Sequence, residues 1–198
     1  YIADLLGQRV PIRGEAGIGY VLEGGFDLAP LMLTPDEIEA AVLGAQWVTL
    51  RGDAALARAA QDLIAKIGAA VPERLRPFAL EPATRAAPNY NVVPDGIDMA
   101  QVRRAIHGAK KIRLTYCDEQ ERETERIVWP FAVGYHETVR LMIAWCELRS
   151  DFRSFRTDRV ADAEFLDERY PERAATLRAR WRKAWNQRAM DVGSPKRI

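Results

Sequence analysis

Two predicted strands meet in residues 144–160, which read AWCELRSDFRSFRTDRV. Apolar and polar residues alternate on both sides of a short polar turn, a pattern typical of two antiparallel strands. Similar alternation predicts strands over residues 111–117, 125–133, 139–149 and 152–160. Four consecutive strands with tight connections indicate an antiparallel meander that curls into a small barrel.

Helices are predicted on both sides of these strands. A short helix is expected over residues 98–107, and a C-terminal helix over residues 170–190. Upstream, Thr34 is expected to cap a helix over residues 35–49, because proline follows it and Glu37 completes a capping box.

A second upstream helix is predicted to begin at Asp53 and to end at Gly68 or before Pro72. Alanine-rich helices of this kind pack closely against each other or against a second subunit. Prolines recur between residues 72 and 94, so that segment is predicted to be a linker.

The first residues combine a helical pattern with a hairpin pattern. Residues 1–6 have helical spacing and are followed by Gly7. Because so short a helix would not be stable alone, we expect the chain to be a fragment that lacks an upstream part. Alternation over residues 10–22, around the glycines at positions 14 and 17, predicts a β-hairpin. The Gly17-Ile18-Gly19 stretch is not expected to bind a nucleotide, because a strand follows it where a helix would be needed.

The composition excludes several classes of protein. Of 198 residues, 48% are hydrophobic and 29% are charged, and the formal net charge is +1, so a globular core is expected. Two cysteines and two histidines leave little for a disulfide scaffold or a metal site, and a reducing, cytoplasmic setting is expected. No apolar run approaches the ~20 residues of a membrane span. No catalytic or cofactor motif is found, so neither enzyme activity nor a cofactor is expected.

Arginine is concentrated at one place in the predicted sheet, at Arg149, Arg153, Arg156 and Arg159. Strand alternation would put Arg156 on one face and Arg153 with Arg159 on the other. A guanidinium group is planar and suits phosphate, so the four residues are interpreted as a candidate anion-binding site. The alternative is a solvated strand whose surface ion pairs contribute little.

Three more residues are candidates for the same ligand site. Tyr116 and Trp145 would stack on bases as part of a pocket wall. The alternative is that both pack in the core, as aromatic residues of strands commonly do. His136 follows a predicted turn and would donate to a ligand or titrate near neutral pH, and the simpler interpretation is a polar turn residue.

Two parts of the sequence resemble known families. Residues 10–20, VPIRGEAGIGY, resemble the wing of the winged helix-turn-helix in bacterial regulators of the YafY type. Residues 113–116 (RLTY), the Trp129-Pro130 pair and residues 144–160 resemble the WYL domain, a ligand-sensing module with an Sm-like or SH3-like β-barrel. The Trp-Tyr-Leu signature of that domain reads Trp145-Cys146-Glu147 in this chain.

The resemblance implies an α+β chain of four parts. They are the end of a recognition helix with the wing (1–28), a helical linker and dimerisation region (29–94), a WYL domain (95–168) and a C-terminal helical extension (169–198). Most of the DNA-reading helix would be missing. Arg9 and Arg13 flank the first strand of the wing, where basic residues would contact DNA phosphates, and the alternative is a solvated hairpin.

The implied function is that of a cytoplasmic bacterial transcriptional regulator. A homodimer would bind a double-stranded DNA operator, and its WYL domain would sense a small-molecule or nucleotide effector, with no membrane partner. Two alternatives stay open. The barrel could bind single-stranded nucleic acid, in which case affinity would grow with added nucleotides. It could also be a structural oligomerisation barrel without a ligand, whose arginines pair with a neighbouring subunit.

Overall fold

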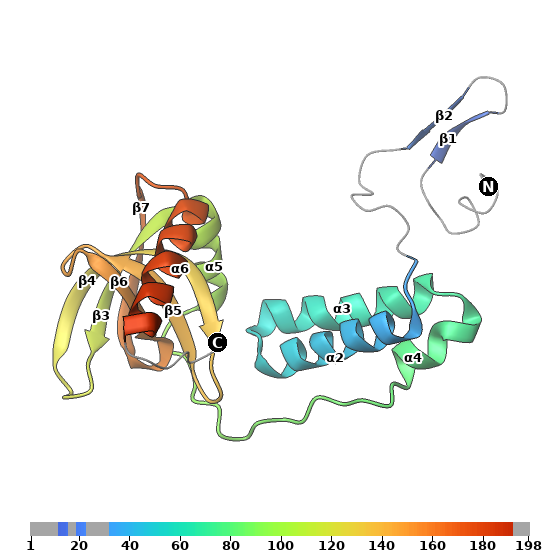
Figure 1. Cartoon of the computed structure of the whole chain (residues 1–198), viewed down its shortest axis with the longest axis horizontal. Coiled ribbons are helices and arrows are strands. Elements are labelled where there is room, and N and C mark those ends of the chain that lie inside the picture. The colour runs from blue at the N-terminus through green and yellow to red at the C-terminus, as the bar shows by residue number, and fades with distance from the viewer. Residues whose placement is uncertain (1–11, 16–18, 23–31, 192–198) are drawn as a thin grey trace. The chain divides into compact units, whose positions relative to one another are not determined.

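The computed structural model describes residues 12–15, 19–22 and 32–191 (Figure 1). The chain divides into two compact units, Tyr1–Ala87 and Pro88–Ile198, and each is described by itself. Within the described ranges, no helix combines the length and apolar character that a bilayer span requires.

The predicted hairpin is present in the first unit. Strand β1 (Ile12–Glu15) pairs antiparallel with β2 (Gly19–Leu22), so this prediction is confirmed. The predicted helix end at residues 1–6 lies outside the described residues. The winged helix-turn-helix as a whole therefore stays a prediction.

Two capped helices follow, as the sequence predicts. Helix α2 (Pro35–Arg51) begins with the full capping box between Thr34 and Glu37. Helix α3 (Ala54–Ala70) begins where the Asp53 carboxylate accepts hydrogen bonds from two backbone N–H groups. The buried Ile38 and Val42 of α2 form the core of this helix pair.

The segment after α3 corrects the linker prediction. The 3₁₀-helix η1 (Glu73–Leu75) and helix α4 (Arg76–Leu80) lie where the prolines predicted irregular structure. Proline is compatible with the first turn of a helix, and Ala79 of α4 is buried against α2. Gly68 does not end α3. It is buried beside α4, where a Cβ would lie 2.9 Å from Leu80 Cδ2, the end of an exposed side chain.

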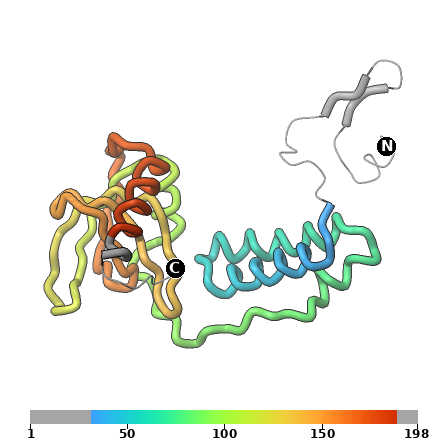
Figure 2. The backbone as a smooth tube through the Cα atoms, viewed as in Figure 1, coloured from blue at the N-terminus to red at the C-terminus, as the bar shows by residue number. Residues whose placement is uncertain are grey.

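The second unit is a five-stranded antiparallel sheet with a helix at each end of its sequence. Its elements are α5 (Met99–Gly108), β3 (Lys110–Cys117), β4 (Glu123–Tyr135), β5 (Arg140–Cys146), β6 (Asp151–Arg156), η2 (Thr157–Arg159), β7 (Val160–Arg169) and α6 (Ala174–Asp191). The strand order is β6-β5-β4-β3-β7. The backbone trace in Figure 2 follows this path from α5 in green to α6 in red.

The strand at residues 160–169 is missing from the prediction. The expected strand over residues 152–160 divides into β6 and η2, and a further strand, β7, then pairs with β3. Strands β6 and β7 are the two edges of the sheet, and no pairing joins them in the described residues, so a closed barrel is not confirmed. The three residues of η2 carry the chain from one edge to the other. The sheet must therefore curl strongly at that corner.

Each face of the sheet has its own apolar core. Side chains of α5, including Val102 and Ala105, pack with Ile112 and Leu114 on one face. On the other face Leu177 of α6 is fully buried among aromatic residues of β4, β5 and β6. Successive residues of β5 alternate between the two cores, which is why the strand is apolar along most of its length.

A β-bulge adapts β4 to helix α6. The pairing register shifts between Pro130 and Ala132, so Phe131 is the extra residue. The Pro130 carbonyl accepts a 2.8 Å hydrogen bond from Tyr170 Oη, and the Phe131 carbonyl accepts a 2.9 Å bond from Arg178. Side chains from α6 and from the residue after β7 thus satisfy backbone groups at the bulge and fix the helix to the sheet.

Candidate functional site

The four candidate arginines form a row along one edge of the sheet. Strand β6 is hydrogen-bonded to β5 on one side and is an edge strand on the other. Arg149 lies in the turn before β6, Arg153 within it, Arg156 at its end and Arg159 in η2. These residues are called the arginine row below.

The alternation prediction holds for two of these residues. Arg153 shares a face of β6 with Phe155, which packs in the α5 core. Arg156 shares the other face with Phe152, which packs in the α6 core. The placement of Arg159 on the Arg153 face is wrong, because Arg159 lies in η2 and not in a strand.

Carboxylates hold one end of the arginine row. Arg156 donates two hydrogen bonds to Asp158, of 3.1 and 2.7 Å, and the Asp158 side chain is only 11% exposed. These bonds keep the pKa of Asp158 below its ordinary value against the opposing effect of burial. Arg159 donates to Glu119 at 3.2 Å. An anion at this end would have to displace both carboxylates.

The other end of the arginine row is more open. Arg153 is 53% exposed and lies 3.6 Å from an Asp151 oxygen, beyond hydrogen-bond distance. Arg149 is exposed in the turn, and the described residues include no ion pair to it. Exposed pairs of this kind contribute little and exchange readily. Arg149 and Arg153 are therefore the guanidinium groups that an incoming anion would meet first.

Tyr116 is both a core residue and a neighbour of the row. Its ring meets Phe155 edge-on at 5.2 Å between centroids, and it packs against the α5 core. Its hydroxyl accepts a 3.2 Å hydrogen bond from the backbone N–H of Arg156. The structure thus brings Tyr116 and Arg156 together.

Trp145 belongs to the opposite face of the sheet. It packs edge-on against Phe152 at 5.1 Å, and the Arg180 guanidinium of α6 lies 5.3 Å from its ring centroid. Helix α6 therefore covers the residue that was expected to line a pocket with Tyr116. The two aromatic candidates do not share one wall.

The remaining candidates lie elsewhere. His136 is exposed in the turn between β4 and β5, where its backbone N–H donates to the Val139 carbonyl at 2.9 Å. That turn lies toward the same end of the sheet as Arg156, which is opposite Leu141. In the first unit Arg13 lies in β1, opposite Val21, and Arg9 falls outside the described residues.

Sequence reasoning missed a polar cluster around Glu147. Lys111 lies 2.8 Å from Glu147 and 2.5 Å from Glu168, and Trp129 Nε1 donates to Glu147 at 2.6 Å. These hydrogen bonds raise the pKa of Lys111. Burial opposes ionisation of Glu147, but the bonds from Lys111 and Trp129 outweigh it and its pKa is lowered.

A second missed cluster joins the start of the second unit to the end of β6. Arg140 pairs with the Asp95 carboxylate, and both side chains are close to nine-tenths buried. Thr157 is fully buried and its hydroxyl lies 2.6 Å from the same carboxylate. The backbone N–H of Gly96 donates to the Thr157 carbonyl at 2.9 Å. No local sequence pattern could reveal contacts between residues so far apart in the chain.

Comparison with known proteins gives these features a family context. Among solved structures, the chain is similar to "Proteasome accessory factor B/C (PafBC) of Arthrobacter aurescens", with 22% identity and a TM-score of 0.36. That match covers 79% of this chain and 24% of the other, so this chain spans about a quarter of the solved chain. The family model of the WYL domain matches residues 98–165, from the start of α5 into β7. The second unit therefore contains a WYL domain.

Proposed function

We propose that this chain is part of a transcriptional regulator whose WYL domain binds an anionic ligand, a nucleotide or a short single strand of nucleic acid. The observation that carries the proposal is the arginine row on the free edge of β6, inside the WYL domain. The proposed role is regulatory rather than catalytic.

The open end of the arginine row makes the first contact in this proposal. Arg149 and Arg153 supply forked donors that suit phosphate oxygens. Arg156 and Arg159 are engaged with Asp158 and Glu119, so they would join only if the ligand displaced those carboxylates. Phosphates would therefore bind along the edge strand, without the aromatic wall of Tyr116 and Trp145.

The first unit supplies the rest of the regulator in this proposal. The β1–β2 hairpin would act as the wing, with Arg9 and Arg13 contacting DNA phosphates. Helices α2 and α3 would form a homodimer through exposed apolar side chains. Trp47, Leu50 and Leu63 are 42%, 43% and 47% exposed, and burying them against a second copy would be favourable.

Calorimetric titration of the 198-residue chain tests the ligand proposal. The titrants are a mononucleotide, a dinucleotide and a single strand of roughly ten nucleotides, a length within the site sizes of small nucleic-acid-binding barrels. The test variant is Arg149→Glu/Arg153→Glu. The matched control is Arg74→Glu/Arg76→Glu, which makes the same charge change at two exposed positions of the first unit.

The expected result is saturable binding that is lost in the test variant and kept in the control. If binding saturates with a mononucleotide, the ligand is a small effector; if affinity rises with each nucleotide, the edge binds a strand. Two phosphate contacts on a single strand predict that log K falls with log salt with a slope of about −1.4. Equal binding by both variants, or no binding of any titrant, would refute the assignment of the arginine row.

A further inference from the structure

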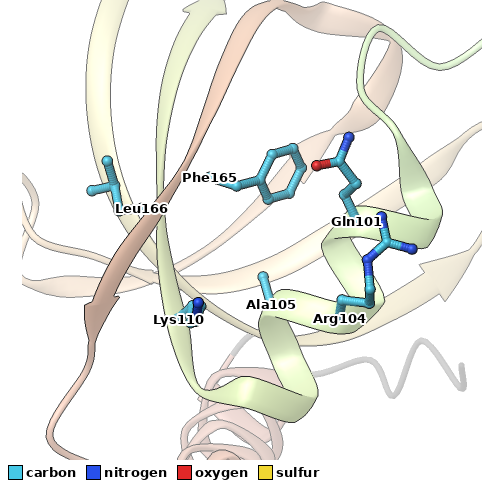
Figure 3. Close-up of a pocket in the computed structure, with 6 residues that line it drawn as sticks. All are labelled: Gln101, Arg104, Ala105, Lys110, Phe165 and Leu166. Atoms are coloured by element: carbon cyan, nitrogen blue, oxygen red, sulfur yellow. The ribbon is translucent and has the colours of Figure 1, made fainter.

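The second unit has a pocket at the sheet edge opposite the arginine row. It lies between helix α5 and strand β7 and has a volume of about 350 Å³. Its lining residues are Gln101, Arg104, Ala105, Lys110, Phe165 and Leu166 (Figure 3). Ligand pockets in proteins start at about 300 Å³, so this one has room for a small organic molecule.

An irregularity in β7 accounts for the pocket. Lys110 is opposite Arg169 and Ile112 is opposite Phe165, so three residues of β7 face one residue of β3. Leu166 therefore lies in the irregular part of the pairing between β7 and β3. The same local shift leaves Phe165 as a partly buried ring next to the helix.

The pocket lining combines an apolar surface with positive charge. Phe165, Leu166 and Ala105 supply the apolar part. In Figure 3 the Phe165 ring and the Gln101 amide point toward one another, and the Arg104 side chain lies beside Gln101. Arg104 and Lys110 are the two cations of the lining, which contains no carboxylate.

The acidic residues next to the pocket do not prevent Arg104 and Lys110 from binding an anion. Lys110 pairs with Asp167 at 2.7 Å, but the Asp167 side chain is fully exposed, so that pair is weak and exchangeable. The Gln101 amide donates to Asp98 at 3.1 Å, which orients its carbonyl group and leaves that group able to accept a bond.

We propose that this pocket binds a small aromatic anion, with its ring on Phe165 and its carboxylate or phosphate between Arg104 and Lys110. A ring would bury the apolar lining, and the negative group would compensate the two cations. The site is separate from the arginine row, because Arg159 precedes the first residue of β7 whereas Phe165 and Leu166 lie further along that strand.

Amide chemical shifts of the isotope-labelled full chain test this proposal. The probes are phenyl phosphate, which has ring and charge, benzyl alcohol, which has the ring alone, and inorganic phosphate, which has the charge alone. The test variant is Arg104→Gln/Lys110→Gln, and the control is Arg74→Gln/Arg76→Gln at exposed positions of the first unit.

Phenyl phosphate is expected to shift the amides of residues 101–110 and 165–166, with an affinity at least tenfold above that of either partial probe. The test variant should weaken binding by about tenfold, as expected for the loss of two partly exposed charge contacts. The control should bind like the wild type.

Two outcomes would overturn the proposal. One is that phenyl phosphate shifts only amides of residues 149–159, which would support the arginine row and leave the α5–β7 pocket without a ligand. The other is that the three probes bind with equal affinity, because the pocket would then not combine ring and charge recognition. The wild-type titration alone decides the location, so the test does not depend on the folding of the variant.

Discussion

Replacing Thr157 by valine should destabilise the second unit through the loss of one hydrogen bond. The Thr157 hydroxyl is 2.6 Å from Asp95 Oδ1 and 3.1 Å from the Arg140 carbonyl. It has a single proton, which therefore goes to the nearer and charged acceptor, Asp95. Valine keeps the shape of threonine and removes only the donor.

The expected loss follows from the burial of this cluster. Thr157 is fully buried, and the Asp95 and Arg140 side chains are 11% and 12% exposed. A hydrogen bond to a charged group contributes about 1.5–3 kcal/mol, and we expect Thr157→Val to lower the free energy of unfolding by that amount. Thr157→Ser keeps the hydroxyl and loses one buried methyl group, so its cost should be about 1 kcal/mol.

Urea unfolding followed by tryptophan fluorescence measures both variants. The chain has five tryptophans, and Trp47 is the one in the first unit, so a Trp47→Phe background reports on the second unit. If Thr157→Val is as stable as the parent, or costs less than Thr157→Ser, the hydrogen bond to Asp95 does not stabilise the unit and the reasoning is refuted.

Three further predictions concern Leu177, Tyr170 and Asp158. Leu177→Ala should lower the free energy of unfolding by about 2–5 kcal/mol in the same assay, because Leu177 of α6 is fully buried against the sheet; a smaller loss would mean that α6 contributes little to the core. Burial raises the pKa of Tyr170 to about 12, above the unfolded value of 10.0. The contribution of the protonated Tyr170 side chain to the free energy of unfolding should be complete below pH 10 and lost as the pH rises toward 12. Phenolate absorbance should show one tyrosine that ionises at higher pH than the others, and Tyr170→Phe should remove that step. The pKa of Asp158 lies below 3.8, chiefly through its hydrogen bond with Arg156, so its contribution is present above pH 3.8 and lost as the pH falls further. In the Asp158→Asn variant, the free energy of unfolding should fall less steeply as the pH is lowered below 3.8. An unchanged pH dependence would show that Asp158 does not stabilise the folded state through its lowered pKa.

Local signals explain the parts of the fold that the sequence predicts. The Thr34 capping box and the Asp53 cap involve residues within one helical turn, and both are confirmed. The hairpin pairs residues 12–15 with residues 19–22, so its alternating pattern is also local. In each case the pattern that determines the structure lies within a few residues of the structure itself.

The missed elements depend on distant partners. In strand β7, only Ala163 and Phe165 pack with the core after Val160, and most of the other residues are exposed, so the alternation is weak. Its pairing with β3 comes from contacts some fifty residues apart. Helix α4 is absent from the prediction because its single proline, Pro77, reads as an interruption, although it lies in a compatible first-turn position.

The candidate site shows the same limit. The sequence places four arginines close together because they are neighbours in the chain. It could not show that Tyr116 and Trp145 lie on opposite faces, because that depends on the register of three strands and on the path of α6. The cluster of Lys111, Trp129 and Glu147 was hidden for the same reason.

The position of the arginine row has a consequence for solubility that holds with or without a ligand. Strand β6 is an edge strand of the described sheet, and edge strands can recruit a strand from another molecule and start aggregation. The Tyr116 hydroxyl and the Asp151 carboxylate already accept hydrogen bonds from two backbone N–H groups of this strand. Exposed charged side chains on an edge strand oppose such sheet extension, and Arg149 and Arg153 supply them here. A bound anionic ligand would neutralise the arginine charge, but it would also cover the strand. The edge of β6 would therefore be either charged and exposed or neutral and covered by the ligand.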